Sequence, residues 1–332
     1  MSLLILDRDA VRAALPMPLA IAAMKEAFSA QSAGRVESPG RTHLAVTPYE
    51  GTSLVMAAFV DDDAAAARAL VVKIVSVFGR NQTLGKSRVQ AAVLVLDPAT
   101  GEPQALLEGA TLTAIRTAAA SGAATDLLAR ADSHTLAVFG AGAQARTHVE
   151  AICAVRPIGT VCAYSRTREK LDVMLADLAQ SSPDRHFVAA ASPAEALARA
   201  DIVVAATSSA VPVFSDAELR EGTHINAIGT YTPDASEIPA QTVARAIVVV
   251  DSRAAAWQEA GDLIQVQRDG VIDASHIHAE LGEILLGTRP ARSDDRAITL
   301  FKSVGLAVQD AVAARHAVQS ALRQHLGKYL EF

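Results

Sequence analysis

The sequence has 332 residues, of which 51% are hydrophobic and 20% are charged, and its formal net charge is −6. An average domain has about 150 residues, so this length predicts two domains with separate cores. The apolar content excludes a disordered chain. The acidic balance and the lack of a basic run argue against a protein that binds nucleic acid or a membrane. Two cysteines make no disulfide framework, and we find neither a signal-peptide core nor an apolar run of membrane-spanning length, so we expect a cytoplasmic protein.

The N-terminal part of the chain mixes helix and strand patterns. Apolar side chains recur at helical spacing in some stretches and form short continuous runs in others, and a turn over 97–103 ends the last run. The predicted helices span 16–30, 112–131 and 305–327, and the predicted strands span 53–56, 69–78 and 89–96. Because the last helix can return to the N-terminal region, we expect residues 1–127 and 299–332 to form one discontinuous α+β domain.

Residues 128–298 show an alternating pattern. Apolar runs of strand length recur with helical stretches between them, which indicates βαβ units and a parallel sheet. The predicted strands span 135–139, 160–165, 187–191, 201–207, 223–229 and 246–251, and the predicted helices span 168–180, 193–199 and 216–221, with a further one that ends near 154. The fold class is therefore α/β, with a doubly wound Rossmann domain over 128–298.

A glycine-rich loop follows the first strand of this domain and opens a helix. Gly140 would make the tight turn, and Gly142 would let a pyrophosphate approach the backbone at the helix N-terminus. An ordinary glycine turn is the alternative, but the strand–loop–helix context favours a dinucleotide site. The loop residues expected to bind the cofactor are Gly140, Ala141, Gly142, Ala143 and Gln144.

The end of the second strand indicates which dinucleotide is bound. An NAD site would place a carboxylate there for the ribose hydroxyls, whereas this chain has Ser165, Arg166 and Thr167. A guanidinium group suits the 2′-phosphate of NADP(H), so we predict NADP(H); if Arg166 is merely solvated, NAD(H) binds as well. Thr207 ends the fourth strand, where it either contacts the cofactor or makes a strand-end turn.

Three cations of the first domain are candidates for binding a substrate. Lys73 interrupts an apolar strand, Arg116 is a lone charge in an apolar helix, and Arg41 follows a proline–glycine turn. Two arginines could hold a carboxylate while the lysine handles a proton near the reacting nitrogen. The alternatives are that Lys73 reaches solvent from an edge strand and that Arg116 pairs with a structural acid.

No other chemistry is indicated by the sequence. The nine histidines show no metal-ligand spacing, so no metal site is expected, and no nucleophile motif is present. We interpret the one cluster, His276, His278 and Glu280, as the polar start of a helix.

Four motifs resemble those of the ornithine cyclodeaminase/mu-crystallin family, and the similarity extends almost from end to end. They are the turn Leu94-Val95-Leu96-Asp97-Pro98-Ala99-Thr100-Gly101-Glu102-Pro103, the helix Leu112-Thr113-Ala114-Ile115-Arg116-Thr117-Ala118-Ala119, the glycine-rich loop, and Phe301-Lys302-Ser303-Val304-Gly305-Leu306-Ala307-Val308-Gln309-Asp310.

The resemblance implies a homodimer in which the first domain supplies the dimer interface and the substrate site. It implies that Arg41, Lys73, Arg116 and Val304 bind the substrate and that Lys73 is catalytic. It also implies that Arg116, Thr207 and Ser303 join the glycine-rich loop and the residues at 165–167 in contacting the cofactor.

Departures from the family pattern bear on the reaction. Ornithine cyclodeaminases have an aspartate that handles the substrate amine where this chain has Tyr231, and an acid where it has Ser165. Both departures favour the members that reduce cyclic ketimines. Arg88 replaces a small hydroxyl residue near the cofactor, which leaves that contact open.

The leading hypothesis is an NADPH-dependent reductase of a cyclic imino acid, such as pyrroline-2-carboxylate or piperideine-2-carboxylate. The alternatives are an ornithine cyclodeaminase that uses NAD, an amino acid dehydrogenase similar to alanine dehydrogenase, and a non-enzymatic protein that binds NADPH and a ligand.

Overall fold

The computed structural model describes residues 2–331, apart from the side chain at position 82, and its contacts divide the chain into two compact units. The first unit contains the residues up to Arg116 and those from Leu306 onward, and the second spans Thr117–Gly305. Among the described residues, no helix has the length and apolar character needed to cross a membrane.

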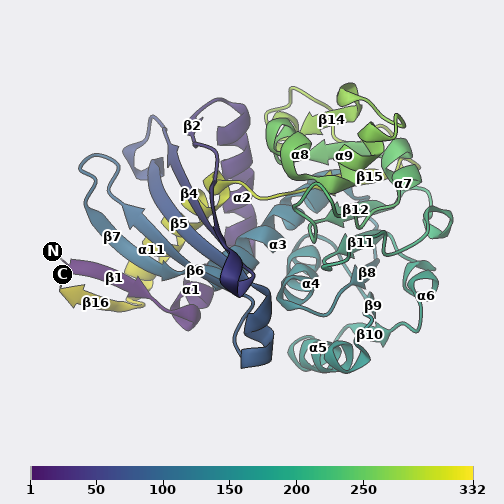
Figure 1. Ribbon diagram of the computed structural model, residues 1–332, viewed down its shortest axis with the longest axis horizontal. Coiled ribbons are helices and arrows are strands. Elements are labelled where there is room, and N and C mark those ends of the chain that lie inside the picture. The colour runs from purple at the N-terminus through teal and green to yellow at the C-terminus, as the bar shows by residue number, and fades with distance from the viewer. Residues whose placement is uncertain (1, 332) are drawn as a thin grey trace. The chain divides into compact units, whose positions relative to one another are not determined.

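The first unit contains an eight-stranded sheet in which most neighbouring strands are antiparallel. Only β1 and β7 pair in parallel, and β1 also pairs with β16, so the first and last strands lie side by side (Figure 1). The strand order is β16 (Lys328–Glu331), β1 (Ser2–Leu6), β7 (Pro103–Glu108), β6 (Val89–Leu96), β5 (Ala69–Phe78), β4 (Gly51–Val60) and β2 (Val36–Glu37), with β3 (Thr42–Val46) also paired to β4. The predicted strands over 69–78 and 89–96 are confirmed.

Helices cover one face of this sheet. The unit contains α1 (Arg8–Ala14), α2 (Met17–Ser32), α11 (Ala307–Gln324) and the short 3-10 helices η1 (Thr47–Tyr49), η2 (Ala65–Ala67) and η3 (Gly79–Leu84). Helix α11 lies against α2 and the strands β4, β5 and β6. Successive side chains of a strand point to opposite faces, so in β5 Val71, Lys73 and Val75 are buried whereas Ile74 is 51% exposed. The face opposite α11 therefore carries exposed apolar side chains such as Ile74.

The second unit is built on an eight-stranded parallel sheet. Its strand order is β10 (His186–Ala189), β9 (Thr160–Tyr164), β8 (Thr135–Phe139), β11 (Ile202–Ala205), β12 (His224–Ala227), β15 (Thr299–Lys302), β13 (Ile247–Val250) and β14 (Ile277–Glu280). The chain order reverses between β8 and β11, and ligands of such sheets bind at the carboxyl ends of the strands beside this switch point. The predicted doubly wound α/β fold is confirmed.

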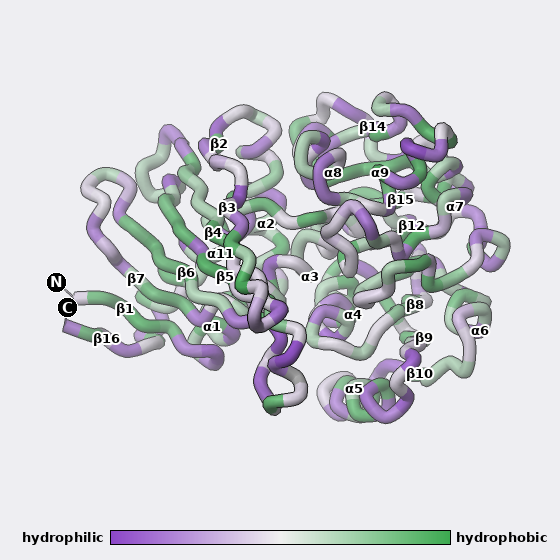
Figure 2. Tube along the Cα trace, in the orientation of Figure 1, coloured by the Kyte–Doolittle hydropathy of each residue, from purple (hydrophilic) through white to green (hydrophobic). Residues whose placement is uncertain are grey.

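Helices pack on both faces of the central part of this sheet, which explains why β8, β11 and β13 are rich in apolar residues (Figure 2). Leu136 and Val138 of β8 pack on one side with residues of α4 and α5, whereas Ala137 and Phe139 pack on the other with residues of α6, α7, α8 and α9. The helices of this unit are the C-terminal part of α3 (Gly109–Leu128), α4 (Ala143–Val155), α5 (Arg168–Ser181), α6 (Pro193–Leu197), α7 (Ala240–Arg245), α8 (Arg253–Glu259), α9 (Gly261–Arg268) and α10 (Leu281–Leu285), with 3-10 helices η4 (Asp216–Glu218) and η5 (Ala274–His276).

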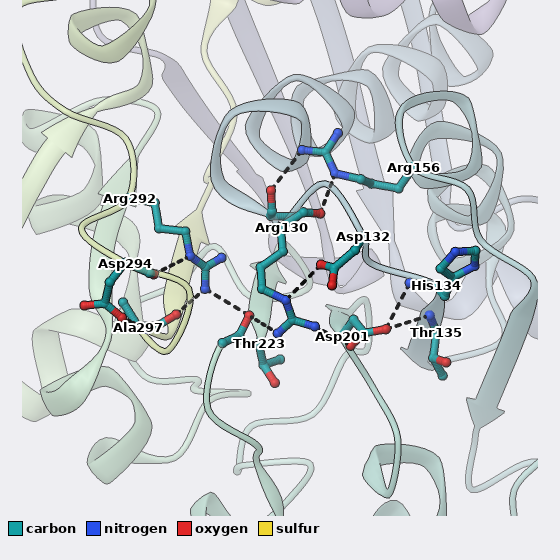
Figure 3. A network of polar contacts seen from close by, with 12 residues as sticks. Arg130, Asp132, His134, Thr135, Arg156, Asp201, Thr223, Arg292, Asp294 and Ala297 are labelled. Atoms are coloured by element: carbon teal, nitrogen blue, oxygen red, sulfur yellow. Dashed lines mark hydrogen bonds and ion pairs between the residues drawn. The ribbon is translucent and has the colours of Figure 1, made fainter.

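Arginine side chains and acids tie together the amino ends of these strands (Figure 3). Arg130 donates to Asp201 over 2.8 Å, and the second oxygen of Asp201 accepts from the backbone N–H groups of His134 and Thr135. Arg292 donates to the backbone oxygens of Leu128 and Gly222, each over 2.9 Å. The network holds the edge of the sheet opposite the carboxyl ends, so it is structural.

Some predicted elements differ from the structure. The cluster at His276, His278 and Glu280 spans η5 and the edge strand β14, and its last residue, Glu280, is the N-cap of helix α10, as the interpretation of a polar helix start requires. The predicted helix over 216–221 is reduced to η4. Strand β15 follows the predicted domain boundary at residue 298, yet all four of its residues are buried in the parallel sheet. Such a short strand directly before a long helix carries too weak a pattern to be recognised.

Candidate active site

The glycine-rich loop has the geometry of an anion-binding turn. Gly140 has φ +116°, and a Cβ atom on it would lie 2.5 Å from the carbonyl oxygen of Ala206, so only glycine fits there. Gly142 is the N-cap of the 13-residue helix α4 and has no side-chain cap, and nothing lies within 4 Å of the position its Cβ would take. The first N–H groups of a helix have no partner within it, and the space beside Gly142 is open, as phosphate binding requires.

The other predicted loop residues surround this turn. Ala141 precedes the N-cap, and Ala143 and Gln144 begin helix α4. The Oε1 atom of Gln144 is buried and has no hydrogen-bond partner among the described residues.

The end of strand β9 presents polar groups without a carboxylate. The Ser165 hydroxyl accepts from the backbone N–H of Thr167 over 3.3 Å, and Thr167 is the N-cap of α5. Arg166 is exposed and has no ion-pair partner in the described part of the chain. Its guanidinium group is thus available to an anionic ligand.

The end of strand β11 is held by a buried acid that sequence reasoning missed. The backbone N–H of Thr207 donates to Oε1 of Glu237 over 2.7 Å, and the Thr207 hydroxyl accepts from the N–H of Ser209 over 2.9 Å. Glu237 is fully buried, and its burial raises the pKa of its carboxyl group to about 7. A lone glutamate in a loop of ordinary composition gave no sequence signal for this role.

A second buried acid holds Ser303 and Val304. The Ser303 hydroxyl donates to Oδ2 of Asp251 over 2.9 Å, and the N–H groups of Val304 and Gly305 donate to the same oxygen over 2.8 and 2.7 Å. Burial raises the pKa of Asp251. The hydroxyl proton of Ser303 is therefore engaged within the protein, and Val304 lies in the core of the second unit.

In the first unit, two of the predicted cations meet at one acid. Lys73 of β5 lies 2.5 Å from Oδ2 of Asp310, and the Nε atom of Arg116 lies 3.0 Å from its Oδ1. A second nitrogen of Arg116, Nη1, donates to Gln309 over 2.6 Å. Lys73 and Asp310 are 1% exposed and Arg116 is 6% exposed, so three charged groups share one desolvated site.

The balance of charge in this cluster is positive. Burial lowers the pKa of Lys73 to about 8, because the attraction of Asp310 only partly offsets burial and the repulsion of Arg116 and Arg41. Arg116 and Lys73 together outweigh burial for Asp310 and lower the pKa of its carboxyl group. One buried carboxylate faces two buried cations and the half-buried Arg41, so the site favours an anion.

Sequence reasoning identified the cations of this cluster but not their partners. Arg116 does pair with a buried acid, as one of the predicted alternatives held, and that acid also holds Lys73. Asp310 lies 237 residues beyond Lys73 and 194 beyond Arg116. The available signal was that Gln309 and Asp310 are the only polar residues at the start of an alanine-rich helix.

Two further residues lie in loops and strand connections. Tyr231 follows β12 and is 41% exposed, and Arg88 is exposed just before β6. Among the described residues, no group of three or more histidine, cysteine or acidic side chains is placed to hold a metal ion.

Comparisons with known proteins agree on one family. The sequence profile of the Ornithine cyclodeaminase/mu-crystallin family matches residues 2–325. A Delta(1)-pyrroline-2-carboxylate reductase of Bacillus cereus is 40% identical over 331 residues, which make up 99% of this chain and 100% of that protein.

Two solved structures extend this similarity to the whole fold. The Thermococcus litoralis Delta(1)-pyrroline-2-carboxylate reductase, in complex with NADH and L-proline, matches with a TM-score of 0.93 and 39% identity over 98% of this chain and 99% of that one. An archaeal alanine dehydrogenase, a dimer with bound NAD, matches with a TM-score of 0.91 and 30% identity over 100% of both chains. The chain therefore belongs to the ornithine cyclodeaminase/mu-crystallin family.

Proposed function

We propose that the protein is an oxidoreductase that reduces a cyclic α-imino acid, such as pyrroline-2-carboxylate or piperideine-2-carboxylate, to the amino acid with a reduced nicotinamide cofactor. The observation that carries the proposal is the buried cluster of Lys73, Arg116 and Asp310. Its excess positive charge suits a carboxylate, and its lysine suits an imine nitrogen that must carry a proton. The names of the similar proteins agree with this substrate class.

The proposed roles follow from the chemistry of each side chain. Arg116, together with Arg41, would hold the substrate carboxylate, because guanidinium groups match its planar geometry. Lys73 would hydrogen-bond to the imine nitrogen and supply its proton. A pKa of about 8 leaves most of the Lys73 side chains protonated at neutral pH and able to release that proton.

The bound cofactor supplies a hydride, which adds to the α-carbon of the imino acid while the imine nitrogen carries the proton. A protonated imine is already a strong electrophile, so orientation and charge stabilisation suffice and no covalent intermediate is needed. The positive site also keeps the carboxylate in place as the charge of the iminium ion disappears.

The test is a pair of assays on the purified protein. We expect NADPH oxidation with pyrroline-2-carboxylate, and no ammonia from ornithine with NAD. Ammonia release at constant NAD would instead establish a cyclodeaminase and would mean that Tyr231 serves where other members use an aspartate. Absence of both reactions, with NADPH still bound, would leave a binding protein.

We further propose that NADP(H) is preferred over NAD(H). The support is that Arg166 is exposed and without an ion-pair partner among the described residues, next to two hydroxyl groups and no carboxylate. Replacing Arg166 with alanine should raise the KM for NADPH about tenfold or more and leave that for NADH nearly unchanged, since a charge-assisted contact contributes about 1.5–3 kcal/mol. An equal change for both cofactors would contradict the preference, and Arg168→Ala, which removes an exposed arginine paired with Asp172, serves as the control.

We also propose that two copies assemble as a homodimer through the face of the first sheet that lies opposite α11. The face opposite α11 presents apolar side chains from adjacent strands, including Val55 of β4 and Ile74 of β5, which are 40% and 51% exposed. An exposed apolar surface of this kind marks an interaction site. The alanine dehydrogenase similar in structure is itself a dimer.

A cytoplasmic location is part of the same proposal. Cys153 and Cys162 are both free thiols, which suits a reducing compartment, and the proposed cofactor is available there.

A further inference from the structure

Glu237 occupies an unusual position between the ends of two parallel strands. Its Oε1 atom accepts from the backbone N–H of Thr207 at the end of β11. Its Oε2 atom is buried and has no hydrogen-bond partner among the described residues. A carboxylate with one unsatisfied oxygen in a desolvated site is costly, so the ionisation state of this group needs an explanation.

An acceptor, the carbonyl oxygen of Thr207, lies near Oε2. A Cβ atom placed on Gly229 would lie 2.1 Å from Oε2 and 2.3 Å from the carbonyl oxygen of Thr207, so both oxygens lie against the same small space beside Gly229. If Glu237 were ionised, its negative oxygen would face a carbonyl oxygen. A neutral carboxylic acid instead offers an O–H donor on this side and an acceptor on the other.

The charged groups around Glu237 do not compel it to ionise. The charged side chains of Lys302 in β15 and Asp262 in α9 act on Glu237, and a hydrogen bond with the Thr207 side chain lowers its pKa, but burial has the largest effect and raises it. Lys302 and Asp262 pair with each other over 2.5 Å, and Asp262 also accepts from the backbone N–H of Glu237 over 2.7 Å. The charge of Lys302 is therefore balanced by the ion pair with Asp262. Lys302 also donates hydrogen bonds to the carbonyl and hydroxyl oxygens of Thr230. Burial raises the pKa of Glu237 to about 7, in keeping with this arrangement.

We propose that Glu237 is a positioning residue of the cofactor site and that it acts as a neutral carboxylic acid, with Oε1 accepting from the N–H of Thr207 and the Oε2 proton donated to the carbonyl oxygen of Thr207. The inference rests on the proposed function in one respect, namely that Thr207 borders the bound dinucleotide. Both polar main-chain atoms of Thr207 are then fixed by one side chain. Loss of the Oε2 proton replaces one of these contacts with repulsion and loosens the end of β11.

This proposal predicts that cofactor affinity depends on pH through Glu237. Binding of NADH should weaken as the pH rises through about 7, by up to about tenfold per pH unit above the pKa. NADH is the suitable probe because its pyrophosphate stays ionised throughout this range, whereas the 2′-phosphate of NADPH titrates near pH 6. Binding can be followed from nicotinamide fluorescence between pH 6 and 9, without turnover.

Two substitutions of Glu237 distinguish a role in positioning Thr207 from a role in the stability of the fold alone. Glu237→Gln keeps the acceptor for the Thr207 N–H and places an amide donor where the acid carries its proton, so it should bind NADH as the wild type does at pH 6 and lose the pH dependence. Glu237→Ala should bind at least about fivefold more weakly at every pH. Gly229→Ala, whose methyl group would displace the carboxyl group, should resemble Glu237→Ala. Glu221→Gln, at an exposed glutamate of the same unit, is the matched control.

Infrared spectroscopy gives a readout that needs no cofactor. The difference spectrum between wild type and Glu237→Gln at pH 6 should contain the carbonyl band of a protonated carboxylic acid, and the band should fade as the pH rises to 9. Absence of the band at pH 6, or an unchanged pH dependence of NADH binding in Glu237→Gln, would overturn the proposal. Intact NADH binding without imino acid reduction would count against the proposed function alone.

Discussion

A lysine ammonium group at 1% exposure, held by one carboxylate and repelled by two guanidinium groups, is the most constrained charge in the first unit. Its pKa of about 8 follows from that conflict, because burial and the repulsion by Arg116 and Arg41 outweigh the attraction of Asp310. A lysine in this state is useful in both directions of a proton transfer near neutral pH. Its ordinary pKa would leave it a reluctant donor.

The first prediction concerns the pH dependence of catalysis by Lys73. In the reduction the lysine must enter protonated, so kcat/KM for the imino acid should fall as the pH rises through about 8. In the reverse oxidation of the amino acid it must enter neutral, so that rate should rise over the same range. Lys73→Met should lower kcat in both directions by about 10²- to 10⁴-fold while NADPH still binds. A variant with a nearly normal rate would contradict the assignment.

Asp310→Asn tests the same cluster from the other side. Removing the carboxylate that pairs with Lys73 should lower the lysine pKa further, so the fall in the reductase rate should move about 1–2 pH units toward acid. The variant loses a partner of two buried cations and should unfold about 3–5 kcal/mol more easily, which is checked by denaturant unfolding. An unmoved pH profile in folded protein would show that Asp310 does not set the state of Lys73.

At the residue scale, the sequence identifies a functional side chain when a charged residue stands within an apolar stretch. Lys73 and Arg116 are charges within apolar runs, and the sequence identified both. Asp310 and Glu237 are acids in ordinary surroundings, and only the fold brings them to partners far away along the chain. The role of these two acids follows from their burial in the fold and not from their neighbours in the sequence.

At the scale of elements, the glycine turn between β8 and α4 was predictable because its causes are local. A positive φ at Gly140 and a bare helix start at Gly142 follow from residue types at fixed spacing. Strand β15 was not recognised because only Leu300 and Phe301 of its four residues are apolar, and its pairing with β12 and β13 places it in the sheet. The edge strand β14 has a similar mixture of two apolar and two polar residues.

The amino edge of the second sheet gives a prediction about stability. Asp201 accepts from Arg130 and from two backbone N–H groups (Figure 3), so Asp201→Asn should lower the free energy of unfolding by about 1–3 kcal/mol. Because the proposed cofactor site is at the carboxyl ends of the strands, the Kd for NADPH should not change. Asp172→Asn, at an exposed helix pair with Arg168, should cost less than about 0.5 kcal/mol. Weaker NADPH binding in folded Asp201→Asn would contradict a purely structural role.

At the scale of the whole molecule, the two faces of the first sheet differ in their burial. One face is covered by α11 and holds the buried cluster at Lys73, and the other carries exposed apolar side chains such as Val55 and Ile74. Alternation along β5 makes the two faces interdependent, because a shift of register by one residue would exchange Lys73 for Ile74. Exposed apolar side chains on adjacent strands mark this face as a site of interaction.

A second copy of the chain is the occupant that the dimer proposal assigns to this face. In a twofold dimer the same surface is used by both copies, so one substitution places two charges at the interface. Ile74→Lys should therefore convert a dimer into a monomer of 34.6 kDa in analytical ultracentrifugation. Val211→Lys, at an apolar residue of the second unit that is 65% exposed, should leave the mass unchanged. A monomeric wild type, or a variant that remains a dimer, would show that this face is covered differently. Reductase activity measured beside the mass would then establish whether assembly matters for the chemistry, because Lys73 is the neighbour of Ile74 on the same strand.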